Sequence, residues 1–159
     1  MTPRDTSADI DVDLVLDFLN TVDVEAGTDL LSDPAGRRAW LAARGLADSD
    51  SAADVRTALR AAVGDPAASR VALSAQVTVS LEPEGPRLVA DDVTGAVLAA
   101  ASRLTVLGDW DRVKICPADD CRWAFFDRSR NHSRTWCSMR VCGNREKARA
   151  WRERARANS

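Results

Sequence analysis

The sequence is short of the side chains on which most catalytic sites depend. Its 159 residues include one histidine and no tyrosine, and aromatic residues make up 5%. It contains no glycine-rich nucleotide loop, no serine–histidine–acid set and no carboxylate cluster with metal-ligand spacing. Its four cysteines stand together near the C-terminal end, where they are better suited to holding a metal ion. The sequence therefore predicts that the protein is not an enzyme.

Long hydrophobic runs are also missing. No apolar stretch approaches the roughly 20 residues that a membrane-spanning helix needs. The segment from Met1 to Asp9 is polar, carries one arginine and lacks the apolar centre of a secretory signal. We therefore expect a cytoplasmic protein that has no contact with a membrane.

Basic residues are scarce in the first part of the chain and abundant in the last. Residues 1–111 hold 9 Lys and Arg against 19 Asp and Glu, a net charge of −10, whereas residues 112–159 hold 13 against 5, a net charge of +8. A basic module on an acidic body favours a polyanionic partner. Docking of the basic module on the acidic body would also explain this distribution, and net charge alone does not separate the two.

Residues 1–111 show the patterns of a mainly helical domain. Apolar residues at spacings of three and four predict helices, and alternation of Val77, Val79 and Leu81 with polar residues predicts a strand that returns after a Pro-Gly turn. Asp33-Pro34 and Asp91 or Asp92 are expected helix starts, and Gly45, Gly64 and Gly108 are expected stops. The expected elements are helices over 11–22, 34–44, 51–63 and 93–107, and strands over 76–81 and 87–90. We expect an α+β fold with one hairpin in this domain.

The spacing of the cysteines is the most informative motif. Cys116 and Cys121 form one pair with four residues between them, and after 15 further residues Cys137 and Cys142 repeat that spacing. Two close thiolate pairs can complete the tetrahedron that Zn²⁺ prefers. The sequence predicts one structural zinc ion; two disulfides, an iron–sulfur cluster or a redox-sensitive zinc site remain as alternatives. His132 could replace a cysteine but is better explained as an exposed turn residue.

Residues 112–159 are expected to form a small treble-clef-like finger with four cysteine ligands. In this arrangement a strand over 123–127 pairs with 134–137, and the last two cysteines lead into a basic helix over 141–157. Ala148, Trp151 and Ala155 would then pack on the hairpin. So small a module cannot hold itself together by a core alone, so metal binding would supply its folding free energy. Four thiolates leave zinc no open position for hydrolysis.

The finger segment resembles a known family. The residues that carry this resemblance are Cys116 and Cys121, Phe125 to Asn131, Arg134 with Trp136 to Met139, and Cys142-Gly143-Asn144-Arg145, and they resemble the CGNR zinc finger family. Leu16 to Thr21 and Trp40-Leu41 resemble its usual N-terminal partner, the ABATE domain. The resemblance implies that all four cysteines bind zinc, and that the protein is a stress-induced transcription regulator whose finger binds DNA.

The arginines of the finger are the candidate contacts to nucleic acid. Four of them fall on one stripe of the last helix and three crowd the turn before it, and guanidinium groups suit phosphates and guanine edges. The seven candidates are Arg128, Arg130, Arg134, Arg145, Arg149, Arg152 and Arg156. Some could instead hold the acidic body, and Arg145 could hydrogen-bond the thiolates.

These observations predict a regulator that binds double-stranded DNA, with an N-terminal domain that senses a signal or mediates assembly. The ligand of that domain is unknown, and a homodimer is expected because one short finger would bind weakly. A protein-interaction adaptor and a thiol–zinc redox sensor are the alternative functions.

Overall fold

The computed structural model describes residues 6–157. Residues 1–5, at the polar start considered above, and residues 158–159, at the end of the predicted finger, lie outside the described residues. The α-helices are α1 (Thr6–Leu19), α2 (Pro34–Ala42), α3 (Ala52–Ala62), α4 (Val93–Val106) and α5 (Asn144–Ala157). The strands are β1 (Val22–Asp23), β2 (Thr28–Asp29), β3 (Thr78–Glu82), β4 (Gly85–Val89), β5 (Val113–Ile115) and β6 (Ala124–Phe126). Shorter helical turns are η1 (Leu30–Ser32), η2 (Trp110–Arg112) and η3 (Met139–Gly143), the last a π-helical turn.

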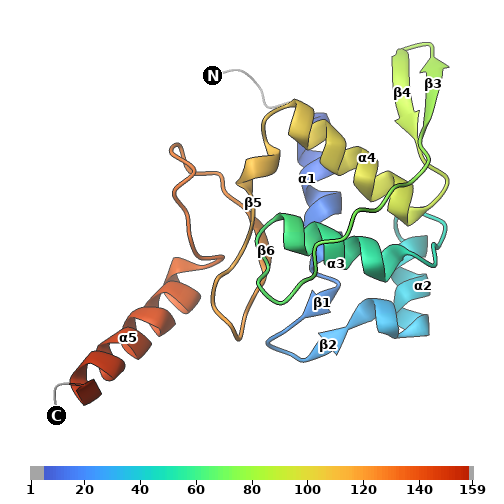
Figure 1. Ribbon diagram of the computed structural model, residues 1–159. Coiled ribbons are helices and arrows are strands. Elements are labelled where there is room, and N and C mark those ends of the chain that lie inside the picture. Colours follow the sequence, from blue (N-terminus) through green and yellow to red (C-terminus); the bar gives the residue numbers. More distant parts are fainter. Residues whose placement is uncertain (1–5, 158–159) are drawn as a thin grey trace.

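The main core lies between α1 and α4, which pack side by side with α3 against them (Figure 1). Val15, Phe18 and Leu19 of α1 are fully buried, as are Val97 and Leu104 of α4. Each such side chain contributes roughly 1.5–3 kcal/mol by leaving water. The strands form three separate antiparallel pairs, so the predicted α+β, mainly helical fold is confirmed.

Aspartate caps set the starts of two helices. The side chain of Asp33 accepts hydrogen bonds from the backbone N–H groups of Ala35 and Gly36, and Pro34 stands at the first position of α2. Asp92 accepts one from Gly95 at the start of α4. These starts were predicted from the sequence, because a cap relies on neighbouring residues alone.

The ends of two helices differ from the prediction. The first helix was expected over 11–22, but it begins by Thr6 and ends at Leu19. It ends early because Thr21 turns back to donate to the carbonyl of Phe18, at 2.7 Å, while Asn20 bonds across to β6. Leu107 was expected to face inward on α4, but it lies beyond the end of that helix and is 59% exposed.

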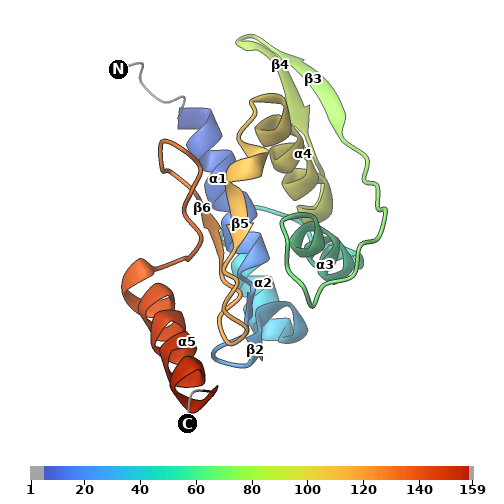
Figure 2. The ribbon, with the colours of Figure 1, turned by 60° about the vertical axis from the view of Figure 1, so that its left-hand side comes forward.

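The β3–β4 hairpin projects from the end of the helical body (Figures 1 and 2). Its register pairs Thr78 with Val89 and Glu82 with Gly85, which confirms the predicted hairpin. Val79 and Leu81 are largely exposed, so this hairpin adds little to the core.

The finger begins with a hairpin that differs from the expected one. Residues 123–127 were expected to pair with 134–137, but β6 pairs with β5, which lies before the first cysteine pair. Val113, Ile115 and Ala124 are buried in the same core as α1 and α4. Burial of these side chains is the physical reason that β5, rather than residues 134–137, becomes the partner strand. The division of the chain between residues 111 and 112 stays a prediction.

The last helix stands away from the rest of the molecule (Figures 1 and 2). None of the residues of α5 is buried, and Trp151 is 66% exposed. The expectation that Ala148, Trp151 and Ala155 pack on the hairpin is therefore wrong. Phe125 and Trp136 already pack around the cysteines, and Ala124 and Phe126 pack on the core of the body, so α5 is left in solvent.

Candidate metal centre and nucleic-acid interface

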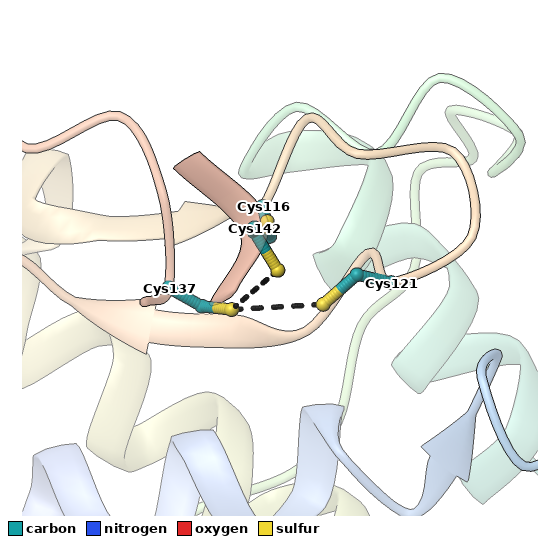
Figure 3. Close-up of side chains that lie close together, drawn as sticks. All are labelled: Cys116, Cys121, Cys137 and Cys142. Atoms are coloured by element: carbon teal, nitrogen blue, oxygen red, sulfur yellow. Dashed lines mark hydrogen bonds between the residues drawn. The ribbon is translucent and has the colours of Figure 1, made fainter. Parts of the chain in front are cut away.

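The four cysteines come together from two parts of the chain. Cys116 follows β5 and Cys121 precedes β6, so this pair lies in the turn of the hairpin. Cys142 lies in η3, just before α5, and Cys137 lies in the loop that leads to it. Their side chains point toward one another (Figure 3). The second pair leads into a helix, as predicted, but the first pair lies in the turn of the β5–β6 hairpin and not in a turn that precedes the hairpin.

The distances between the sulfur atoms fit a tetrahedral metal site. All four Sγ atoms lie within 4.8 Å of one another, and Cys137 Sγ lies 3.6 Å from those of Cys121 and Cys142. Zinc–sulfur bonds of about 2.3 Å place tetrahedral ligands roughly 3.8 Å apart, whereas a disulfide needs about 2.05 Å. The cysteines are free thiols, three of them buried. This donor set fits one structural Zn²⁺.

Backbone bonds shape the first cysteine turn. Cys116 N donates to Trp123 O at 2.9 Å, and Ala118 O accepts from the N–H groups of both Cys121 and Arg122. Arg122 closes the turn with a φ of +48°, a conformation that side chains other than glycine rarely adopt. The wide spacing of four residues is therefore accommodated by a defined, strained turn.

The thiols differ in how readily they ionise. Burial opposes ionisation of Cys116, but hydrogen bonds from the backbone N–H groups of Cys137 and Ala118 outweigh it and lower the pKa of that thiol. Burial raises the pKa of Cys121 to about 11 and also raises the pKa of Cys137. Zinc ligation requires thiolates, so binding of the ion would release protons from these groups.

Asp127 organises the loop between the two cysteine pairs, a role that the sequence analysis missed. Its carboxylate is fully buried and accepts hydrogen bonds from Lys114 Nζ at 2.7 Å and from the backbone N–H groups of Ser129 and Arg134. Burial opposes ionisation, but these donors dominate and hold the pKa of Asp127 well below its ordinary value. An aspartate just after a strand and two residues before a serine suggests such a turn, but only the fold shows Lys114 beside it.

Three of the seven candidate arginines make several contacts within the protein. Arg145 donates to Cys142 Sγ at 3.5 Å and pairs with Glu25 and Asp120, so it supports the metal site. Arg134 donates to the carbonyls of Trp136 and Cys137 and lies over the ring of Phe125. Arg128 lies over Phe126 and pairs with Asp9 on α1.

The side chains of the other four candidate arginines make few or no contacts within the described part of the protein. Within residues 6–157, the side chains of Arg130, Arg152 and Arg156 make no ion pair or hydrogen bond, and Arg149 pairs only with Glu146 of its own helix. Residues 144–157 carry six basic and two acidic side chains, a net charge of +4. The structure thus leaves a basic, exposed helix. His132 is an exposed turn residue, as expected.

The helical body and the finger meet through Asn20. Its side-chain amide donates to Ala124 O at 2.9 Å, and its side-chain oxygen accepts from Ala124 N at 2.8 Å. Asn20 therefore bonds to β6 as a neighbouring strand would. The segment from Leu16 to Asn20, which carries part of the resemblance to the ABATE domain, thus contacts the finger directly.

The fold and the site together define a zinc-finger type of protein. It has a mainly helical body joined to a small four-cysteine finger with an exposed basic helix. The CGNR zinc finger family matches residues 112–155. The ABATE family, described as "Putative stress-induced transcription regulator", matches residues 12–119. Since this second match covers more than half of the sequence, the chain belongs to the ABATE family, and it carries a CGNR zinc finger. No curated protein gives a significant match. No helix within residues 6–157 is long and apolar enough to cross a membrane.

Proposed function

We propose that this protein is a transcription regulator that binds double-stranded DNA through its zinc finger, with α5 as the principal contact. Zinc held by Cys116, Cys121, Cys137 and Cys142 would fix η3 and thereby the direction of α5. An α-helix with its side chains is about 10–12 Å across, so it fits a major groove about 12 Å wide, and its 14 residues extend for about 20 Å.

The observation that carries this proposal is the exposure of α5 together with its unpaired charge. No residue of α5 is buried, and within residues 6–157 the side chains of Arg152 and Arg156 make no ion pair or hydrogen bond, so these two arginines have no structural task in the described part of the chain. Arg152 and Arg156 lie on one stripe of the helix, which also holds Arg149. Phosphate contacts by these side chains would supply affinity, and base contacts would supply specificity.

Of the remaining candidate arginines, three have structural roles in this proposal and one is a further DNA contact. Arg145 and Arg134 hold the finger in shape, and Arg128 ties it to α1, so replacing them would change the scaffold as well as the charge. Arg130, at the tip of the loop before α5, is the additional contact that we propose. The predicted dimer would add a second finger and double the number of contacts.

A salt titration of DNA binding tests the proposal. The double variant Arg152→Ala, Arg156→Ala should weaken binding to duplex DNA at least tenfold and lower the slope of log affinity against log salt by about 2, since two phosphate contacts are lost. Zinc content, measured by atomic absorption, should stay at that of the wild type. Fluorescence anisotropy with a labelled random-sequence duplex measures both the DNA affinity and its dependence on salt concentration.

The matched control is Arg38→Ala, which removes an exposed arginine from α2 on the helical body. It should leave DNA affinity unchanged. Equal weakening by both changes would show a nonspecific effect of net charge, and a salt-independent or undetectable interaction in the wild type would leave the adaptor function as the better explanation.

A further inference from the structure

Three arginines face one cavity between the helical body and the first cysteine turn. The cavity has a volume of about 200 Å³ and lies between α3, the segment after it and the finger. Arg56 and Arg60 come from α3, and Arg122 comes from the turn that holds Cys116 and Cys121. Asp65 lines the same cavity and is the one acidic residue among its lining residues.

Arg56 and Arg60 are held rigidly. Their side chains are 7% and 5% exposed. Arg56 bonds both oxygens of Asp29, each at 2.6 Å, and Thr21. Arg60 bonds Asp65 at 2.7 Å and the carbonyls of Leu19 and Arg122. Guanidinium groups fixed in this way present their remaining N–H donors without further loss of side-chain freedom.

Arg122 is incompletely satisfied. A guanidinium group has five N–H donors, and among the described residues the guanidinium of Arg122 makes one hydrogen bond, from Nη1 to Asp65 at 3.5 Å. Its Nε is buried without a partner. Buried polar groups are nearly always hydrogen-bonded, so a guanidinium this poorly paired requires an explanation. Counting the two carboxylates of Asp65 and Asp29, the three arginines leave a net charge of +1 at the cavity.

We propose that this cavity binds a small oxyanion group, a carboxylate or a phosphate, held by Arg122 with help from Arg56 and Arg60. The oxygens of such a group match the forked donors of arginine and would balance the excess charge. The inference goes beyond the proposed function, since it assigns a ligand class to the N-terminal domain, which the sequence predicts to sense a signal or to mediate assembly.

Binding there would act on the finger as well as on the body. Arg60 Nη2 donates to the carbonyl of Arg122 at 2.6 Å, and Arg122 directly follows Cys121, one of the four cysteines that fit a zinc ion. An anion that contacts α3 and Arg122 at once would clamp the cysteine turn to the helical body. The orientation of the finger, and with it that of α5, would then depend on the ligand.

Calorimetric titration of the zinc-loaded full chain with inorganic phosphate and, separately, with malonate tests the site, in chloride buffer of constant ionic strength and without DNA. We expect saturable binding of at least one of the two, with a stoichiometry of one per chain. Tighter binding of phosphate would indicate a phosphorylated ligand, and tighter binding of malonate a carboxylic acid. Arg122→Ala should weaken that binding at least tenfold, while Arg38→Ala should leave it unchanged.

Thr57→Glu is a second variant that leaves the finger intact. Thr57 lines the cavity and is exposed, so a carboxylate there should repel the anion and also weaken binding at least tenfold, with normal zinc content and circular dichroism. Absence of saturable binding of both anions, or equal affinity of wild type and both cavity variants, would overturn the proposal. Because no DNA is present, such a failure is distinct from a failure of DNA binding.

Discussion

Arg56 and Arg60 lie beside Val55 and Leu59 on α3, and all four side chains are buried. Both arginines are buried because each finds a carboxylate, Asp29 for Arg56 and Asp65 for Arg60. A buried charge is tolerated when it is paired and hydrogen-bonded. The sequence did not reveal these residues, since their carboxylate partners are set by the fold.

Asp29→Asn should destabilise the protein in a pH-dependent way. The hydrogen bonds from Arg56, followed by its charge, outweigh burial and lower the pKa of Asp29 below its ordinary value. A lowered pKa gives stability that is present above the unfolded-state pKa of about 3.9 and is lost as pH falls through the folded-state value. We expect a loss of about 2 kcal/mol at pH 7, less than the 3–5 kcal/mol for a fully buried pair, because the Asp29 side chain is 31% exposed.

Urea unfolding at pH 7, 5 and 3.5 measures this effect. The difference between wild type and Asp29→Asn should be constant at pH 7 and 5 and smaller at pH 3.5. Asp50→Asn removes an exposed aspartate without a partner among the described residues and should change the free energy of unfolding by less than about 0.5 kcal/mol. A pH-independent difference at Asp29 would mean that shape, and not charge, explains the pair.

At the scale of elements, the turn η3 explains why glycine stands after Cys142. An added Cβ on Gly143 would lie 2.5 Å from Met139 Sδ and 3.2 Å from Trp136 Cδ1. Gly143 is buried in the turn that places the last zinc ligand and starts α5. A side chain at this position would therefore displace the side chain of Met139 and press on Trp136, which precedes Cys137.

Gly143→Ala should weaken zinc binding and lower the stability of the zinc-loaded protein by about 1–3 kcal/mol, the usual cost of overpacking. Competition with a chromogenic zinc chelator measures the affinity. The double variant Gly143→Ala, Met139→Ala should recover most of the loss, since Met139 is half exposed and makes the closest contact. If removal of the methionine side chain brings no recovery, the glycine acts through its backbone instead.

At the scale of the whole molecule, the zinc site and the main core are joined by the β5–β6 hairpin. Val113, Ile115 and Ala124 belong to the core of the body, whereas Cys116 and Cys121 lie in the turn of the same hairpin. Asn20 adds two hydrogen bonds between α1 and β6. Metal removal should therefore affect the finger unequally along its length.

Removal of zinc with a chelator should release the outer part of the finger and leave its hairpin attached to the body. Hydrogen exchange followed by mass spectrometry should show loss of protection over 137–157, while the amides of β6 and α1 keep most of theirs. The hydrophobic packing of β5 and β6 does not depend on the metal, which is the reason for this difference. Simultaneous loss of protection in α1 and α4 would show that the two parts unfold as one cooperative unit.

Features that depend on neighbouring residues or on exact side-chain chemistry could be read from the sequence alone. The aspartate caps at Asp33 and Asp92, the β3–β4 hairpin and the four cysteines with zinc-ligand spacing could all be predicted, because caps, turns and metal ligands need particular residues at fixed offsets. Tertiary structure decided which elements pack together. It made β5 the partner of β6, buried Asp127 beside Lys114, committed Arg145 to the metal site and left α5 in solvent. These outcomes depend on contacts between residues far apart in the chain, whose free energies local patterns do not contain.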